Sequence, residues 1–166
     1  MKFDSIEDLR SHGFKGFRKI EELQESACSP VPNYQGVYLI VRVVDQDPIY
    51  LNASIGGHFK GKNPSVSIQE LKDNWVNKAI ILYVGKAGGS KSNATLKKRV
   101  WQYMQFGMGK SIGHWGGRYI WQIEGSNKLL VCWKESNGEE PILIESEIIN
   151  KFSHIHNKGP FANLRD

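Results

Sequence analysis

The N-terminal part of the chain opens with a helical pattern of apolar and polar residues. Apolar side chains recur there at three- and four-residue intervals, at Ile6, Leu9, Phe14, Phe17, Ile20 and Leu23. This spacing places them on one face of a helix, so it predicts a helical extension over residues 1–33. The helical pattern cannot continue through Ser29-Pro30-Val31-Pro32, because proline lacks a backbone N–H and clashes with the preceding turn.

Two apolar runs then predict strands at the centre of a sheet. Residues 36–44 are nearly all apolar and rich in β-branched side chains, and residues 79–84 repeat the pattern before Gly85. Continuous runs of this length are typical of strands that are covered on both faces. We therefore expect a buried strand at each place, the second one ending at Gly85.

The residues between and after these runs predict shorter elements. Residues 45–77 are rich in Gly, Pro, Asn and Asp and predict an insertion with a short strand at 49–51 and a helix at 68–76. Further strands are expected at 119–123 and 129–134, joined by a hairpin turn.

Capping residues place two more helices. Asn93 or Thr95 can cap a helix that runs to about Phe106. Pro141, a favourable first helical residue, begins a helix that runs to about Phe152. The expected fold is of the α/β (α+β) class, with a small mixed, largely antiparallel central sheet flanked by helices.

Composition is that of an ordinary globular domain. The 166 residues fit one domain spanning 1–166, with 40% hydrophobic and 23% charged residues. No apolar run is long enough to cross a bilayer, and the N-terminus lacks the pattern of a signal peptide, so we expect a cytoplasmic protein without a membrane partner. Cys28 and Cys132 show no CxxC spacing and are expected to be free thiols.

Positive charge is concentrated in one stretch. The net charge is +5, and residues 86–118 contain no Asp or Glu. The basic residues of that stretch are Lys86, Lys91, Lys97, Lys98, Arg99, Lys110 and Arg118. Aromatic residues lie among them, at Trp101, Tyr103, Phe106 and Trp115. This mixture suits nucleic-acid binding, although a solvated helix face above a core stripe explains the stretch equally well.

Glu145 is the most informative acidic residue. On a helical wheel it falls among Ile142, Ile148, Ile149 and Phe152, whereas Glu147 points to the opposite side. A carboxylate on a core-facing stripe needs a cation to offset its desolvation. A structural salt bridge and a metal ion both meet that need.

Arg99 is a candidate for either role. On the helix that follows Thr95, Leu96 and Val100 mark the buried side, and Arg99 and Tyr103 share its edge. A guanidinium there can offer two parallel N–H donors to a phosphate, or it can pair with Glu145.

Two strand tyrosines complete the set of candidates. Each lies two residues from a glycine, in Gly36-Val37-Tyr38 and Tyr83-Val84-Gly85. A buried strand tyrosine is usually a core residue with one satisfied hydroxyl. Because a glycine lies two residues away in both cases, we consider Tyr38 and Tyr83 together as candidates for a functional site.

These motifs resemble the GIY-YIG nuclease superfamily, which includes homing endonucleases, some restriction enzymes and the nuclease domain of UvrC. The similarity covers about residues 36–163 in five ordered elements. They are Gly36-Val37-Tyr38, Tyr83-Val84-Gly85 with Lys86-Ala87, Leu96-Lys97-Lys98-Arg99-Val100, Ile144-Glu145-Ser146-Glu147-Ile148-Ile149 and Pro160-Phe161-Ala162-Asn163. Tyr103 stands where some members carry His and others Tyr.

The resemblance implies an endonuclease that hydrolyses DNA with one Mg²⁺ or Mn²⁺ ion. Glu145 would hold the ion, and Arg99 would stabilise the transition state. Tyr38 or Tyr83 would activate or orient the water, and the sequence does not distinguish them. Tyr103 and Lys86 would contact phosphate or orient water, and Asn163 would fix the geometry of the site.

The chain departs from the family pattern in spacing. Tyr38 and Tyr83 are separated by an insertion at about 45–77, and a second lengthening spans 107–123. Substrate binding and plain stabilisation are both open roles for these segments. Three functions remain open as well: an endonuclease, acting alone, as a homodimer or in a larger restriction or repair assembly; a non-catalytic DNA-binding module; and a globular protein with a buried Arg99–Glu145 ion pair.

Overall fold

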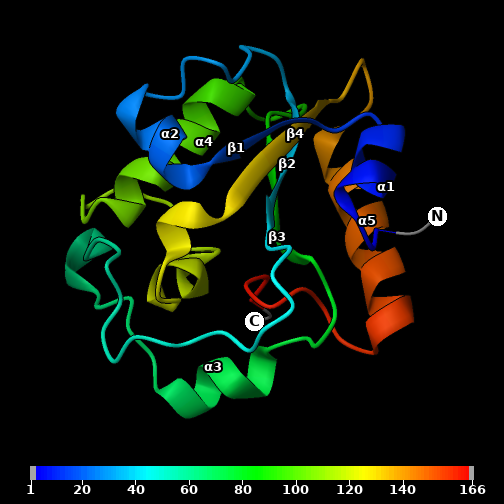
Figure 1. Cartoon of the computed structure of the whole chain (residues 1–166). Helices are drawn as coiled ribbons and strands as arrows, with labels where there is room; N and C mark the ends of the chain where they lie inside the picture. Colours follow the sequence, from blue (N-terminus) through cyan, green and yellow to red (C-terminus); the bar gives the residue numbers. More distant parts are fainter. Residues whose placement is uncertain (1–2, 165–166) are drawn as a thin grey trace.

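The fold is built on one antiparallel sheet. The computed structural model describes residues 3–164, so the two positions at each end of the expected 1–166 domain lie outside the described residues. Within that range four strands pair antiparallel in the order β1-β4-β2-β3 (Figure 1). The strands are β1 (Lys15–Lys19), β2 (Gly36–Val41), β3 (Ile81–Ala87) and β4 (Leu130–Glu135).

Helices cover both faces of this sheet. Over the same residues the α-helices are α1 (Ile6–Ser11), α2 (Ile20–Glu25), α3 (Ile68–Asn74), α4 (Leu96–Gly107) and α5 (Pro141–His156). The 3₁₀ helices are η1 (Phe59–Gly61), η2 (Arg118–Gln122) and η3 (Ser126–Lys128). α1 and α5 lie on one side of the sheet and α2 and α4 on the other, which confirms the expected fold class (Figure 1). None of these helices is long and apolar enough to cross a lipid bilayer.

Strand β2 separates the two hydrophobic cores. All six of its residues are buried, as expected for a strand covered on both faces. Val37 and Leu39 pack in the core under α1 and α5, whereas Tyr38 and Ile40 pack in the core under α2 and α4. Successive side chains of a strand point to opposite faces, so one strand serves both cores.

The N-terminal prediction was wrong between its two helices. Lys15–Lys19 forms the edge strand β1, which pairs with β4, so residues 1–33 are not an all-helical extension. Gly13 and Gly16 have φ values of +92° and +99°, which a continuous helix does not allow. A Cβ atom on Gly16 would lie 2.5 Å from the Trp133 ring, so strand pairing there depends on glycine.

Two of the expected strands were also wrong, the one at 119–123 that was to begin the hairpin and the short one at 49–51 in the insertion. The first segment forms η2, and the second contributes one isolated bridge, between Tyr50 and Ile123. Buried Gln122 explains the difference, because its amide binds the backbone of Leu51 and of Val66. One polar side chain thus attaches the insertion to the core.

Most other predicted boundaries hold, but β2 ends at Val41 and not at residue 44, because Val43 and Val44 are about half exposed and leave the core. The Thr95 hydroxyl caps α4, and Pro141 begins α5, which runs four residues beyond the expected end at Phe152. Strand β3 continues through Gly85 to Ala87, so Gly85 is not its end. Cys28 and Cys132 are free and buried, as expected.

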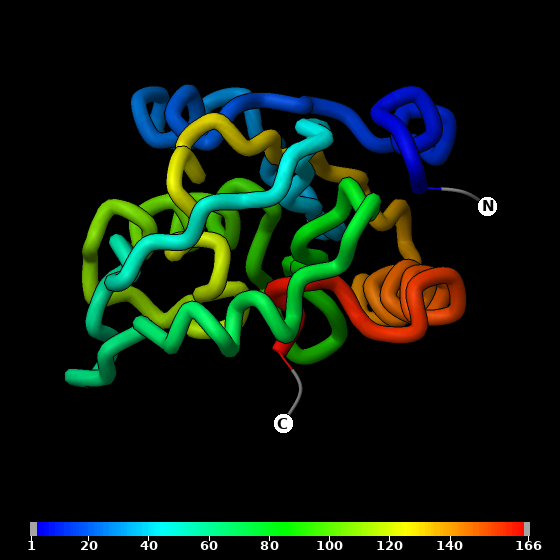
Figure 2. Tube along the Cα trace, turned by 60° about the horizontal axis from the view of Figure 1, so that its bottom comes forward, coloured from blue at the N-terminus to red at the C-terminus, as the bar shows by residue number. Residues whose placement is uncertain are grey.

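The C-terminal segment closes the fold beside β3. The Ala162 N–H donates to the Leu82 carbonyl at 2.8 Å, and the Lys158 ammonium donates to the Asp73 carbonyl at 3.3 Å. Figure 2 shows this segment in red next to the green insertion and β3. The insertion, β3 and the C-terminus therefore lie together at one edge of the sheet.

Gly85 offers a test of this packing. A Cβ atom there would lie 2.2 Å from Cζ of Tyr38, a ring that is buried and cannot move aside. We expect Gly85→Ala to lower the free energy of unfolding by about 1–3 kcal/mol, as overpacking does. Chemical denaturation measures the change. Gly116→Ala is the control, because its Cβ would meet only the Tyr83 hydroxyl, at 3.6 Å; equal stability of the two variants would contradict the packing.

Candidate active site

Three phenols cluster on the α4 side of the sheet. Tyr38 of β2 pairs with Gly85, and Tyr83 of β3 pairs with Ile40, so the two tyrosines are diagonal neighbours with ring centroids 6.2 Å apart. Tyr103 of α4 approaches Tyr83 to 5.4 Å and Tyr38 to 6.4 Å. The residue exposures of Tyr38, Tyr83 and Tyr103 are 1%, 8% and 0%. Tyr103, expected at the edge of α4, is instead fully buried.

Glycines make room for these rings. The Tyr38 ring crosses directly over Gly85, where any side chain would collide with it. Gly117 has φ +82° and accepts a hydrogen bond of 2.6 Å from the Tyr103 hydroxyl through its carbonyl. Position 85, in the second signature half, therefore requires glycine, because a side chain there would collide with the Tyr38 ring.

His114 joins this cluster, although the sequence did not indicate it as a site residue. Its Nε2 lies 2.6 Å from the Tyr38 hydroxyl, and its Nδ1 lies 2.8 Å from the Gly116 carbonyl. A carbonyl only accepts, so Nδ1 carries the ring proton and donates to it, and Nε2 accepts a hydrogen bond from the Tyr38 hydroxyl. The imidazole also stacks on Tyr103 with centroids 4.1 Å apart. The sequence feature that could have indicated His114 is the set of glycines around it, because glycine allows a loop to turn toward the core.

Electrostatics keep these groups neutral. Burial, and then the neighbouring Arg99, lower the pKa of His114 to about 3. Burial raises the pKa of Tyr83 to about 12 and that of Tyr38 well above its ordinary value. Arg99 opposes the shift at both phenols, whereas Glu145 adds to it. Arg99 and Glu145 are thus the two charged side chains that act electrostatically on both tyrosines.

Arg99 points from the first turn of α4 toward the His114 loop. Its guanidinium donates to Gln102 Oε1 at 3.1 Å and to the Gly113 carbonyl at 3.2 Å. Within residues 3–164 it forms no ion pair with Glu145, so the hypothesis of a structural Arg99–Glu145 pair is wrong. The half-buried guanidinium has donors left for an anion.

Glu145 lies at the margin of the buried face of α5. That face consists of Ile144, Ile148 and Phe152, whereas Ile142, which we expected on it, is 50% exposed. Across the described residues, the half-buried carboxylate has no hydrogen-bond or ion-pair partner. Burial raises the pKa of Glu145, and Lys86 opposes that shift.

Asn163 holds β3 in place next to Tyr83. Its side-chain oxygen accepts from the Val84 N–H, and its amide nitrogen donates to the Val84 carbonyl, both at 2.9 Å. These two bonds attach the C-terminal segment to β3. The role of Asn163 in fixing the geometry of a site stays a prediction.

The basic residues expected to bind nucleic acid separate into two groups. Lys86 on β3 and Arg118 on η2 belong to elements that adjoin the site. Lys91, Lys98 and Lys110 are exposed on loops and on α4, and half-buried Lys97 influences the thiol of Cys28. The structure therefore does not gather all six at the tyrosine cluster.

Glu145 fits the binding of one hard cation. Magnesium commonly binds proteins through one or two carboxylates and takes its other ligands from water and substrate phosphate. Among residues 3–164 no cluster of three His, Cys, Asp or Glu side chains could enclose a metal ion. A single carboxylate without a partner, half-buried beside Lys86, suits the open type of site.

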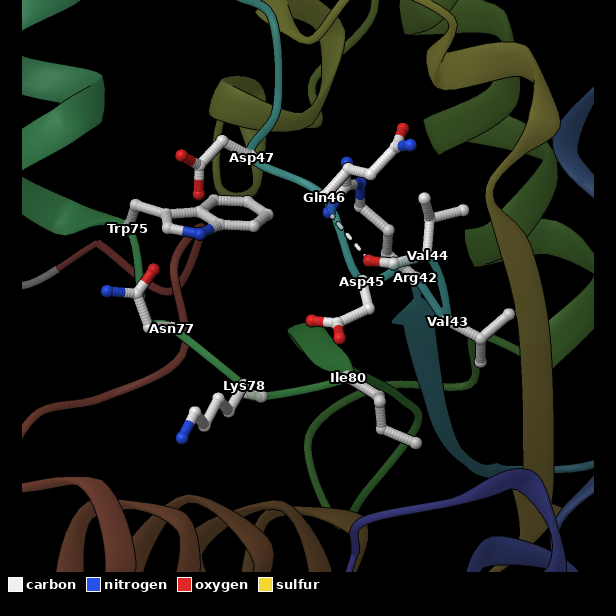
Figure 3. A pocket seen from close by; sticks show the side chains of 11 residues that line it. Arg42, Val43, Val44, Asp45, Gln46, Asp47, Trp75, Asn77, Lys78 and Ile80 are labelled. Carbon is white, nitrogen blue, oxygen red and sulfur yellow. Dashed lines mark hydrogen bonds between the residues drawn. The ribbon is translucent and has the colours of Figure 1, made fainter.

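A separate hollow of about 630 Å³ lies at the other end of the β2–β3 pair (Figure 3). Its charged side chains are Arg42, Lys78, Asp45 and Asp47, two of each sign. The Arg42 guanidinium lies over the Trp75 ring at 5.4 Å. Because these charges balance, the hollow has no preference for a polyanion.

Comparison of the chain with protein-family models, with curated proteins and with solved structures finds no match. Membership of the GIY-YIG superfamily therefore stays a prediction from five short motifs. The geometry around Tyr38 and Tyr83 has to support the function by itself.

The buried imidazole makes a prediction about stability. A folded pKa of about 3 against an ordinary 6.5 means that the unfolded chain binds the His114 proton more readily. The His114 contribution is fully present above pH 6.5 and falls by about 1.4 kcal/mol per pH unit below it. We expect His114→Gln, which can keep both hydrogen bonds, to weaken the decline in unfolding free energy between pH 6.5 and 4.5.

Urea denaturation at several pH values tests this expectation. Exposed His58 provides the matched control, and the unfolding free energy of His58→Gln should depend on pH as that of the wild type does. An unchanged slope in His114→Gln would show that the imidazole is not held neutral in the fold.

Proposed function

We propose that the protein is a metal-dependent endonuclease of the GIY-YIG type that hydrolyses phosphodiester bonds of DNA. One observation carries the proposal: Arg99 donates to the Gly113 carbonyl in the loop that places His114 against Tyr38, yet within residues 3–164 it forms no ion pair with Glu145, the half-buried carboxylate of α5. A cation and an anion that do not neutralise each other can act on a bound phosphate and a bound metal ion. A phosphodiester is the substrate that needs both.

Arg99 and the two strand tyrosines have distinct roles at the phosphate. Arg99 keeps donors free to neutralise charge on the phosphoryl oxygens as the water attacks. The Tyr38 hydroxyl directs its proton to His114, so its oxygen faces other partners as an acceptor. Tyr38 is only 1% exposed, so the neighbouring Tyr83, at 8%, is the phenol that can accept a hydrogen bond from the attacking water and align it.

Both phenols stay protonated over the working range of pH. Burial raises the pKa of Tyr83 to about 12 and that of Tyr38 well above its ordinary value, so neither phenol is ionised at neutral pH. Glu145 would hold the divalent ion, and the chemistry that such an ion would supply there is a more acidic water and stabilisation of negative charge on the leaving oxygen. His114 positions Tyr38 and does not act as an acid, because an imidazole with a pKa of about 3 does not hold a second proton at neutral pH.

Glu145→Gln separates this function from a structural role. At neutral pH the ionised carboxylate is buried without a partner, so the substitution should leave the unfolding free energy equal or higher. Nicking of supercoiled plasmid with Mg²⁺ should fall by at least about 100-fold, since even supporting residues of metal sites contribute 10–100-fold. Binding of DNA should persist.

The matched control is Glu147→Gln on the same helix. Glu147 is exposed and pairs with Lys151 at 2.8 Å, so its loss should affect neither nicking nor folding appreciably. Equal nicking by the two variants would contradict the role of Glu145. DNA binding by the wild type without Mg²⁺- or Mn²⁺-dependent nicking would favour the non-catalytic binding module instead.

A further inference from the structure

A groove of about 510 Å³ lies beside the candidate active site, between α3, η2 and the C-terminal segment. Its polar lining residues are Glu70, Asn74, Arg118, Tyr119, Lys158 and Asn163. Pockets of about 300–1,000 Å³ are typical of small-ligand sites, so the groove can take a nucleotide. Two of its walls come from the insertion and from the lengthened segment 107–123.

The groove adjoins the tyrosine cluster through two of its lining residues. Asn163, on one wall, binds the backbone of Val84 next to Tyr83. Arg118, on another wall, follows Gly117, where a Cβ atom would lie 3.0 Å from Cε1 of Tyr83. A strand bound at Tyr83 therefore reaches the groove with its adjacent nucleotides.

Two cations face this space from different segments. The Arg118 guanidinium lies 4.8 Å from the Trp115 ring centroid and donates to the Trp115 carbonyl at 3.4 Å, which holds it in place. The Lys158 ammonium donates to the Asp73 carbonyl and has further donors. The one carboxylate of the lining, Glu70, accepts a hydrogen bond from the Tyr119 hydroxyl.

We propose that this groove binds a backbone phosphate of the same nucleic-acid strand, next to the phosphodiester at Tyr38 and Tyr83. Arg118 and Lys158 are the groups that contact it. The inference rests on the proposed function, because that function places the strand at Tyr83. It gives the two added segments a role in substrate binding and assigns Lys158, which no motif indicated, to the interface.

Salt-dependent DNA binding tests the groove without cleavage. Binding of a fluorescein-labelled DNA duplex to Glu145→Gln protein is measured by fluorescence anisotropy over a range of NaCl concentrations, without divalent metal. Each phosphate contact contributes about 0.7–0.9 to the slope of log K against log salt. Arg118→Ala with Lys158→Ala removes the contacts to this one phosphate and should therefore reduce the slope by about 0.9 on a duplex, and Lys158→Ala alone, at an exposed position, by a part of that.

A charge-matched control is available on the opposite edge of the sheet. Lys15 and Lys19 are exposed on β1, and Lys15→Ala with Lys19→Ala removes the same charge far from the groove. This double variant should show the same slope of log K against log salt as the Glu145→Gln protein. An unchanged slope in both Lys158→Ala and the groove pair would overturn the groove proposal while DNA binding by the parent still supports the proposed function.

Two further outcomes would also overturn the proposal. If Glu145→Gln protein shows no DNA binding at all, the groove and the proposed function both fail. If Lys158→Ala loses binding of deoxyadenosine monophosphate but keeps the DNA slope, the groove takes a free nucleotide rather than a strand.

Discussion

The antiparallel pairing of β2 with β3 places Tyr38 across Gly85, and the other candidate groups take their positions from that contact. A shift of one residue would turn Tyr38 to the opposite core, because side chains alternate along a strand. The register is fixed by the two buried faces of β2, which leave no alternative pairing with equal burial. The position of the site is thus a consequence of how the core packs.

Two charged side chains at the site lie where partial burial disfavours their charged forms. Glu145 keeps an unneutralised carboxylate in a half-buried place, and Arg99 keeps a guanidinium near an imidazole whose pKa it helps to lower. Both arrangements cost free energy in the isolated protein. A phosphate and a divalent cation would offset both costs when bound, which is the reason to interpret the arrangement as functional.

Local pattern predicted the central elements, because β2, β3, α4 and α5 each bury a continuous face, and it selected Tyr38, Tyr83, Arg99 and Glu145 as candidates for a site. The same pattern failed at Lys15–Lys19, where helical spacing was overridden by pairing with β4, and at η2, where Gln122 binds the insertion. His114 was missed because its importance arises from a contact with Tyr38, 76 residues away, which no local pattern shows. The depth of Tyr103 depends on the same long-range packing.

The most direct test of the site is the chemistry of its product. Wild-type protein is incubated with supercoiled plasmid and Mg²⁺, and the nicked product is then treated with DNA ligase and ATP. Water attack with departure of the 3′ oxygen leaves a 5′-phosphate and a 3′-hydroxyl, so the account predicts nicks that ligase reseals and that chelator prevents. Nicks that ligase cannot reseal, or none with either Mg²⁺ or Mn²⁺, would contradict it.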